Sequence, residues 1–335
     1  MNLPTTGSNT TGTRGVVAVD KVGNKIRFYD PASLKEIKSF DGPEPCVHEL
    51  AISHDHKWAY VPLYGDGIYG GNKKPNNKVL VLDLERQEIA DLVTLGDDYL
   101  APHGMVATAD GKLWVVCDIP RKLVLLDPAR RAVEAAYDCP VKGPHLICAT
   151  ADGARLYISA KKGDVTAFDT KARAFIASIS VRAPGVESGN GSGTEGITPT
   201  PDGTRIVAID NIGGDLRVID VAGNRETDRV PMMAQALTNP KRSRLGKLMF
   251  SPDGRHLVVT GYTSGNCWLV DAGDFRKQTL VPVAKGPMGM AFPPEGGSVI
   301  VTSHDSGLLT RIDLASQRAV AAYDGGSGIE VLTYY

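Results

Sequence analysis

The sequence predicts an all-β protein in which seven four-stranded blades form a closed ring, a seven-bladed β-propeller. Runs of four to six β-branched and apolar residues alternate with turns of Gly, Asp, Asn and Pro, and no long segment has a helical period. One unit recurs: a strand, a Pro-Asp-Gly-type turn, a second strand and a third strand that ends in Asp. Copies of it are TPDGTRIVAIDNIGGDLRVID, SPDGRHLVVTGYTSGNCWLVD and PPEGGSVIVTSHDSGLLTRID. Such internal repetition is typical of ring and solenoid architectures.

The repeats also predict how the ring closes. Inner strands are expected to begin near one residue in each repeat: His48, His103, His145, Glu195, Gly246, Met288 and Ser327. The last inner strand, GSGIEVLTYY, has no strands after it, whereas the first three strands, GVVAVD, NKIRFYD and KEIKSF, have no inner strand. Pairing them completes the last blade and leaves few exposed strand edges. We therefore assign residues 1–13 to an N-terminal tail and residues 14–335 to a single propeller domain.

Composition excludes several classes of function. The formal net charge of −1 offers no basic surface for nucleic acid. No apolar stretch reaches the length of a membrane span, and the N-terminus lacks a basic region followed by an apolar one. The five cysteines are scattered and form no CxxC pair, which argues against a disulfide framework or a zinc knuckle. We expect a soluble protein, either cytoplasmic or periplasmic with its signal peptide removed.

Three histidines occupy the same position in consecutive repeats. His48, His103 and His145 each lie seven residues before the acidic residue of the turn, and Glu195 has this offset in the next repeat. The repeat therefore places all four side chains at the mouth of the central channel. Three imidazoles and a carboxylate predict a divalent metal site, and this ligand set fits Zn, Mn, Fe, Ni or Cu alike. The alternatives are a solvated polar channel or direct recognition of an anionic ligand.

The long loops are predicted to lie on the same face as the histidines. In a four-stranded blade, loops that enter the inner strand and loops that join the second and third strands share one face, opposite the Asp-Gly turns. The long loops of these two kinds are residues 65–77, 183–194 and 231–245. Binding sites usually lie under such elaborated loops. We expect Tyr69 to act as a lid residue, and Arg242 and Arg244 either to bind a substrate carboxylate or to form a solvated charge run.

Candidate proton-transfer groups stand where second strands end on this face. They are Tyr64, Lys161, Tyr262 and His304. A lysine or tyrosine beside a divalent cation can reach the pKa that a general base needs. Asp118 and Asp210 occupy equivalent positions and are expected to be ordinary turn residues. The remaining histidines belong to the opposite face and are expected to be solvated: His54, His56 and His256.

Several segments carry a family resemblance. AYVPLYGDGIYGGNKKPNNKVLVLD, LYISAKKGDVTAFD and SPDGRHLVVTG resemble the seven-bladed propellers of the YVTN/YncE-like group, which are related in architecture to lactonase-type propellers. The resemblance covers nearly the whole chain, although YVPL, LYIS or LVVT replaces the YVTN tetrapeptide. Virginiamycin B lyase-type propellers carry similar Pro-His-Gly starts to inner strands. Oligogalacturonate lyases bind manganese with three histidines and a glutamine at a propeller mouth, where this chain has Glu195. Such a fold hosts many activities.

These observations favour a metal-dependent enzyme of the lyase or isomerase type, acting on a small substrate with a carboxylate or carbonyl group. A lactonase-like hydrolase or an iron-dependent oxygenase could use the same histidine cluster. A non-catalytic binding or scaffold propeller is the remaining alternative. The shared register of the histidines argues against it, because a scaffold does not require such alignment.

Overall fold

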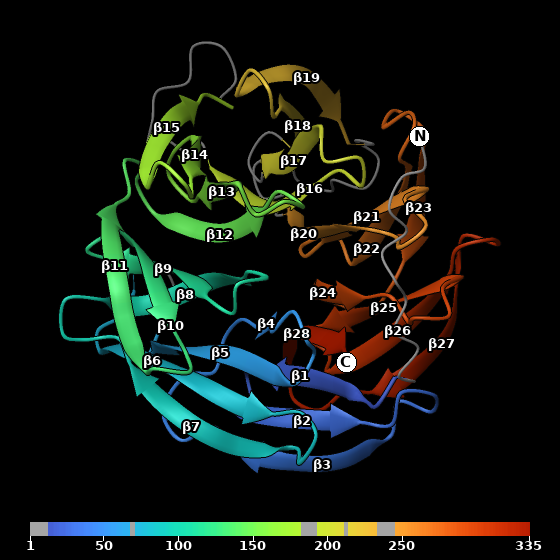
Figure 1. Cartoon of the computed structure of the whole chain (residues 1–335). Helices are drawn as coiled ribbons and strands as arrows, with labels where there is room; N and C mark the ends of the chain where they lie inside the picture. The colour runs from blue at the N-terminus through green and yellow to red at the C-terminus, as the bar shows by residue number, and fades with distance from the viewer. Residues whose placement is uncertain (1–12, 68–70, 182–192, 211–213, 233–244) are drawn as a thin grey trace, which may run out of the picture.

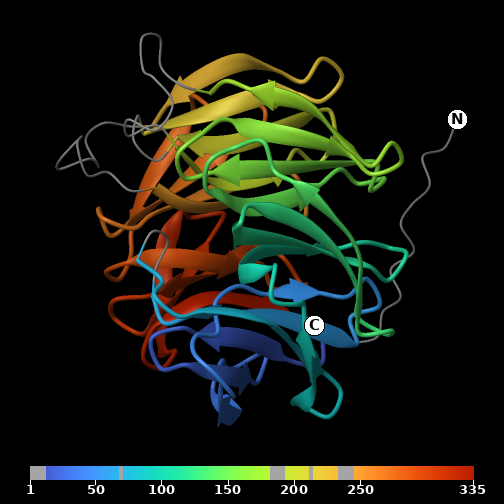
Figure 2. The ribbon, with the colours of Figure 1, turned by 90° about the vertical axis from the view of Figure 1, so that its left-hand side faces the viewer.

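The computed structural model describes residues 13–67, 71–181, 193–210, 214–232 and 245–335. Within these ranges the chain forms 28 strands in seven four-stranded antiparallel sheets, arranged as blades around a central channel (Figure 1). The predicted seven-bladed β-propeller is confirmed. Seen from the side, the blades stack around the ring with their strand ends on its two faces (Figure 2). No helix in these ranges has the length and apolar character that crossing a membrane would require.

Each blade has an inner strand at the channel, two middle strands and an outer strand at the rim, named below in that order. Blade 1 contains β28 (Ile329–Tyr334), β1 (Val16–Asp20), β2 (Lys25–Tyr29) and β3 (Glu36–Asp41). Blade 2 contains β4 (Ala51–Ile52), β5 (Trp58–Gly65), β6 (Pro75–Asp83) and β7 (Glu88–Thr94). Blade 3 contains β8 (Leu100–Ala107), β9 (Leu113–Ile119), β10 (Lys122–Asp127) and β11 (Ala132–Asp138). Blade 4 contains β12 (Pro144–Ala149), β13 (Arg155–Ala160), β14 (Val165–Asp169) and β15 (Ala174–Ile179). Blade 5 contains β16 (Thr194–Pro199), β17 (Arg205–Asp210), β18 (Asp215–Asp220) and β19 (Arg225–Pro231). Blade 6 contains β20 (Leu245–Phe250), β21 (His256–Gly261), β22 (Asn266–Asp271) and β23 (Gln278–Pro282). Blade 7 contains β24 (Pro287–Ala291), β25 (Ser298–Ser303), β26 (Leu308–Asp313) and β27 (Arg318–Asp324).

The two ends of the chain close the ring in blade 1, as the repeat pattern predicts. Strand β28 pairs antiparallel with β1, so that Tyr334 lies opposite Val16 and Val331 opposite Val19. The two strands lie side by side in Figure 1. Beyond them, the amide of Arg14 donates a hydrogen bond of 2.8 Å to the carbonyl of Tyr335. Every inner strand therefore belongs to a complete four-stranded sheet.

The hydrophobic core lies between neighbouring blades. Alternate residues of β9 face opposite neighbours: Val115 packs in a cluster with Val79 of blade 2, whereas Val116 packs with Ile158 of blade 4. This alternation follows from the period of two in a strand. Because both faces of the middle strands are covered, β9 is hydrophobic almost throughout.

The inner strands share an irregularity that shapes the channel. In blade 3 the pairing passes from Pro102 opposite Cys117 to Met105 opposite Val115, so two residues face a single partner and form a β-bulge. The same shift recurs at the equivalent place in blades 1, 4, 5, 6 and 7. In blade 2, residues 48–50 lie outside the strand, between an isolated bridge at Val47 and the start of β4. The bulge allows two consecutive residues per blade to approach the axis.

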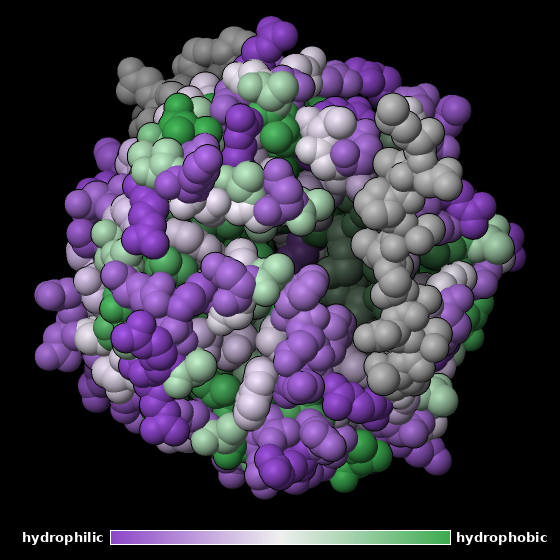
Figure 3. All heavy atoms as spheres, in the orientation of Figure 1, coloured by the Kyte–Doolittle hydropathy of each residue, from purple (hydrophilic) through white to green (hydrophobic). Residues whose placement is uncertain are grey.

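Figure 3 shows one face of the disc, where hydrophilic residues predominate and the centre is hollowed. The channel contains a cavity of about 160 Å³ that is lined by residues of all seven inner segments. Glu49 and Lys247 are its charged lining residues, and apolar side chains such as Leu146 and Met290 form most of the rest. The channel is therefore a narrow, mainly apolar space with an ion pair inside it.

Candidate functional site

The four residues of the predicted metal site form one group at the channel mouth. We call His48, His103, His145 and Glu195 the first ring; each is only 2–5% exposed. The imidazole centroids of His48 and His103 are 4.3 Å apart in an edge-to-face arrangement, and those of His103 and His145 are 4.0 Å apart. The structure thus brings the three histidines of blades 2, 3 and 4 into contact, in the order in which the blades follow one another.

The imidazoles of the first ring are neutral at neutral pH. Burial lowers the pKa of His48 and His103 well below the usual value, and nearby lysine and histidine charges lower it further. Burial and the charge of Lys161 lower the pKa of His145 to about 4, although Glu195 opposes this. The buried Nδ1 atoms of all three histidines have no hydrogen-bond partner among the described residues. Neutral imidazoles with unpaired nitrogens are the form that binds a metal ion.

Glu195 is held by two neighbours. The Nζ of Lys161 donates to both carboxylate oxygens of Glu195, at 2.7 and 2.8 Å, and the Nε2 of His145 lies 3.0 Å from Oε1. The hydroxyl of Ser159 donates to the backbone carbonyl of Glu195 at 2.7 Å, which fixes the bulge of blade 5 against blade 4. Lys161, predicted as a proton-transfer group, is therefore the counter-ion of Glu195.

A second ring of channel residues lies next to the first, and the repeat pattern did not predict it. These are the second residues of the six bulges and, in blade 2, the residue after His48: Gly104, Leu146, Gly196, Lys247, Gly289, Glu330 and Glu49. Lys247 donates to both oxygens of Glu49, at 2.9 and 2.6 Å. One nitrogen each of His48 and His103 and one oxygen of Glu49 all lie within 4.8 Å of one another. Glu49, which was not predicted as a ligand, belongs to this close set of described residues, whereas the predicted ligands His145 and Glu195 do not.

The second ring also connects His304 to the first ring. The Nε2 of His304 lies 3.7 Å from the carboxylate of Glu330, which lies 3.8 Å from the Nζ of Lys21. That Nζ is 3.5 Å from the Nε2 of His48. On the outer side, Asp305 lies 3.1 Å from the Nδ1 of His304 and accepts a hydrogen bond of 2.6 Å from Tyr262. His304 and Tyr262 thus belong to one group at the rim, linked to the histidines through Glu330 and Lys21.

Tyr64 and Asp118 form a buried pair beside the histidines. The ring of Tyr64 lies 5.1 Å from that of His48 and 5.3 Å from that of His103, and its hydroxyl donates to Asp118 Oδ2 at 2.6 Å. The other oxygen of Asp118 is buried and has no partner among the described residues. Burial raises the pKa of Asp118 to about 7, although Tyr64 and Lys161 oppose the shift. Asp118 is therefore a buried residue of β9, and the expectation of an ordinary turn residue was wrong.

The raised pKa of Asp118 predicts a pH-dependent stability difference. The folded protein holds this proton more tightly than the unfolded chain, in which an aspartate titrates near ~3.9. The stability that the proton contributes is therefore lost as the pH rises from about 4 to about 7. We expect the stability of Asp118→Asn relative to the wild type to rise by up to about 3 kcal/mol between pH 4.5 and pH 8. Urea unfolding at the two pH values measures this. A difference that does not change with pH, or an equal change in the exposed control Asp98→Asn, would contradict it.

Asp210, the other strand-end aspartate, has a structural partner. Its carboxylate accepts a hydrogen bond from the fully buried guanidinium of Arg217, which also lies 3.5 Å from Asp215 and from Glu226. Asp210 therefore neutralises a buried arginine in blade 5. Three predicted site residues fall outside the described residues, and their roles stay predictions: Tyr69, Arg242 and Arg244.

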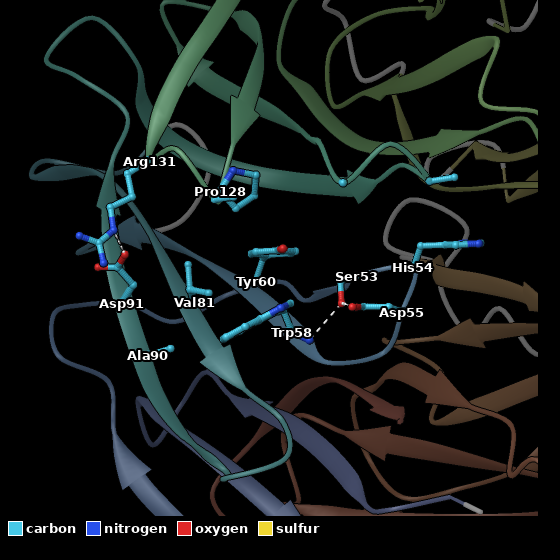
Figure 4. Close-up of a pocket in the computed structure, with 13 residues that line it drawn as sticks. Ser53, His54, Asp55, Trp58, Tyr60, Val81, Ala90, Asp91, Pro128 and Arg131 are labelled. Carbon is cyan, nitrogen blue, oxygen red and sulfur yellow. Dashed lines mark hydrogen bonds and ion pairs between the residues drawn. The ribbon is translucent and has the colours of Figure 1, made fainter. Parts of the chain in front are cut away.

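The opposite face carries a separate pocket of about 560 Å³ between blades 2 and 3 (Figure 4). Trp58 and Tyr60 form its wall, His54 and Asp55 lie at one end, and Arg131 and Asp91 form an ion pair at the other. A further groove of about 480 Å³ follows between blades 3 and 4. Because such grooves recur between the turn ends of adjacent blades, we attribute this one to the architecture and place the candidate site at the histidines.

The comparisons with known proteins support the fold but assign no family. No protein-family model matches the sequence, and neither does any curated protein. Hydrazine synthase of Kuenenia stuttgartiensis is similar over 87% of this chain and 90% of its own, with 18% identity and a TM-score of 0.69. A protein of unknown function from Desulfotomaculum acetoxidans and a periplasmic gluconolactonase of Pseudomonas aeruginosa are each similar over 96% of this chain and 98% of their own. Their identities are 14% and 17%, with TM-scores of 0.73 and 0.72. These likenesses show the fold alone, which the chain shares with a gluconolactonase and a hydrazine synthase.

Proposed function

We propose that the protein is a metal-dependent enzyme of the lyase or isomerase type, acting at the channel mouth on a small substrate with a carboxylate or carbonyl group. The observation that carries this proposal is the contact of three buried, neutral imidazoles whose Nδ1 atoms lack partners among the described residues. Leaving such groups unpaired costs free energy, which a bound ion would recover. A divalent ion held there would polarise a substrate oxygen and stabilise the negative charge that develops on it.

The charges around the first ring favour an anionic substrate. Three buried carboxylates, Glu49, Glu195 and Glu330, face three amines, Lys21, Lys161 and Lys247, so their formal charges cancel. Because the imidazoles are neutral, a divalent ion would leave the site with an excess of positive charge. A carboxylate or an oxyanion would offset that excess, whereas a cationic substrate would increase it.

Asp118 is the best-placed group for proton transfer. Lys161 is engaged by Glu195, and His304 and Tyr262 are engaged by Asp305 at the rim. Asp118 instead keeps one buried oxygen without a partner among the described residues, and its pKa of about 7 suits exchange of a proton near neutral pH. In the proposed reaction Asp118 accepts the substrate proton, while the hydrogen bond from Tyr64 orients its carboxylate.

Hydrolysis of a ring ester is a second candidate function. It is favoured by the shared architecture with the Pseudomonas aeruginosa gluconolactonase, which extends over nearly the whole of both chains. The same residues would serve, because Asp118 can accept a proton from an attacking water as well as from carbon. The two reactions differ in their product, so a single assay format separates them.

The test is metal-dependent turnover on a defined panel. The protein is stripped with a chelator and reconstituted with Mn, Fe(II), Co, Ni, Cu or Zn. It is then incubated in deuterated buffer with small 2-hydroxy and 2-oxo carboxylates and with glucono-1,5-lactone. NMR detects elimination, isomerisation or exchange of carbon-bound protons, and ring opening of the lactone identifies the hydrolase. We expect turnover that requires the ion. Equal turnover by metal-free and reconstituted protein, or none with any ion and substrate, would contradict the proposal.

A further inference from the structure

Glu49 is better placed than Glu195 to complete a metal site with the histidines. Its carboxylate oxygen belongs to the set within 4.8 Å that includes nitrogens of His48 and His103. Donor atoms bonded to one ion at about 2.0–2.2 Å lie roughly 3 Å apart, so small side-chain rotations would close this set. The irregular segment around residues 48–50 makes the arrangement possible, because consecutive side chains of a regular strand point to opposite sides.

Glu195 is engaged elsewhere. Both of its oxygens accept hydrogen bonds from Lys161, which belongs to the adjacent blade 4, and Oε1 is also 3.0 Å from the Nε2 of His145. His145 uses one ring nitrogen in that contact. The three side chains therefore form one hydrogen-bonded group at the junction of blades 4 and 5. Recruiting Glu195 to an ion would break two short hydrogen bonds and separate it from His145.

Glu49 is also paired with a lysine, but this lysine belongs to a distant blade. Lys247 comes from blade 6, which blades 7 and 1 separate from the blade of Glu49, so this ion pair crosses the channel. The charge of the buried Glu330 also acts on this ammonium group. If an ion displaced Lys247 from Glu49, Glu330 would still offset part of the charge of the lysine.

We infer that His48, Glu49 and His103 are the metal ligands, and that Lys247 occupies the Glu49 carboxylate when the ion is absent. The inference rests on the proposed metal dependence and names the ligands and the class of ion. Two imidazoles and one carboxylate leave half of an octahedron open, which is the ligand set of non-haem iron(II) sites. The site would therefore take a six-coordinate ion such as iron(II), with open positions for substrate oxygens. His145 and Glu195 would stay outside the ligand set and keep their hydrogen-bonded network with Lys161.

The inference predicts opposite effects for the two partners of one ion pair. Cobalt(II) serves as the probe, because its visible absorption reports both binding and coordination number. We expect Glu49→Gln to weaken cobalt binding by at least ~100-fold, since losing even a residue that only orients a ligand costs 10–100-fold. Lys247→Met should tighten binding by about 10-fold, because it removes the cation that competes for Glu49. Glu195→Gln, which removes a nearby charge but no ligand, should weaken binding at least ~10-fold less than Glu49→Gln does. The bound wild type should show the weak absorption of six-coordinate cobalt.

Folding controls keep this test decisive. Glu49→Gln leaves Lys247 buried without its main partner, so the double variant Glu49→Gln/Lys247→Met, which removes both charges, is measured beside it by circular dichroism and cobalt titration. We expect the double variant to fold and still fail to bind cobalt. Wild-type binding by the double variant, no tightening by Lys247→Met, or loss of binding in Glu195→Gln would overturn the inference while leaving the metal dependence intact. A wild-type protein that binds no cobalt would instead overturn the proposed function together with the inference.

Discussion

Val115→Asp is expected to destabilise the protein by about 4 kcal/mol or more at pH 7.5, because it buries an unpaired carboxylate. Val115 is fully buried in β9 and packs with Val79, Met105 and Val124 between blades 2 and 3. None of these neighbours can donate a hydrogen bond from its side chain. The measurement is urea-induced unfolding of wild type and variant, followed by circular dichroism.

Val115→Ala is the matched control, since it removes methyl groups from the same position without adding charge. We expect it to cost roughly 2 kcal/mol, in the range for lost core methyl groups. The cost of the aspartate should shrink at low pH, where the carboxylate is protonated. Equal costs for the two variants would show that the interface between blades 2 and 3 admits water, contrary to the packing described.

His103→Ala should lose metal binding and turnover while the ring stays folded. His103 lies between His48 and His145, so its removal leaves the two flanking imidazoles without the shared neighbour. Loss of a direct ligand should weaken binding by at least ~100-fold, since even residues that only orient ligands contribute 10–100-fold. The measurements are cobalt titration and the thermal unfolding curve.

The control for this variant is His54→Ala, the same substitution at an exposed histidine on the opposite face. We expect it to bind cobalt as the wild type does. We also expect His103→Ala to remain much more stable than Val115→Asp, because the cores between blades do not include the first ring. If His103→Ala unfolded as readily as Val115→Asp, the histidine cluster would be a structural element and not a metal site.

The blade count and the register of His48, His103 and His145 could be predicted because both follow from repetition. A repeat fixes the number of strands, and an equal offset from the Asp-Gly turn fixes the height of each side chain in the channel. The closure by β28 and β1 could also be predicted, because the first three strands had no inner strand and the last inner strand had no outer strands.

The second ring could not be predicted from strand alternation, which directs the residue after each histidine away from the axis. The bulges reverse this for Lys247 and Glu330, and the irregular segment at residues 48–50 does so for Glu49. Neither feature has a clear sequence signal. One hint was available: three of the second-ring residues are glycines, Gly104, Gly196 and Gly289. A Cβ at Gly289 would lie 2.6 Å from the backbone oxygen of Glu330, so these positions mark where adjacent inner strands approach closely.

The role of Asp118 could not be predicted for a different reason. An aspartate at the end of a strand is common in turns, and only its surroundings distinguish it. Those surroundings come from Tyr64, which is far away in the sequence and belongs to the neighbouring blade. The contact between the two blades, and not a local motif, produces the buried carboxylate and its raised pKa.

Metal content is the most direct test of the central claim that the channel mouth holds an ion. The protein, purified without an affinity tag, is dialysed, reconstituted anaerobically with iron(II) or manganese(II), freed of unbound ion and measured by elemental analysis. We expect about one equivalent per chain in the wild type, and a large loss in His103→Ala that His54→Ala does not share. Less than a tenth of an equivalent in the wild type with every ion, or equal content in all three proteins, would contradict the account.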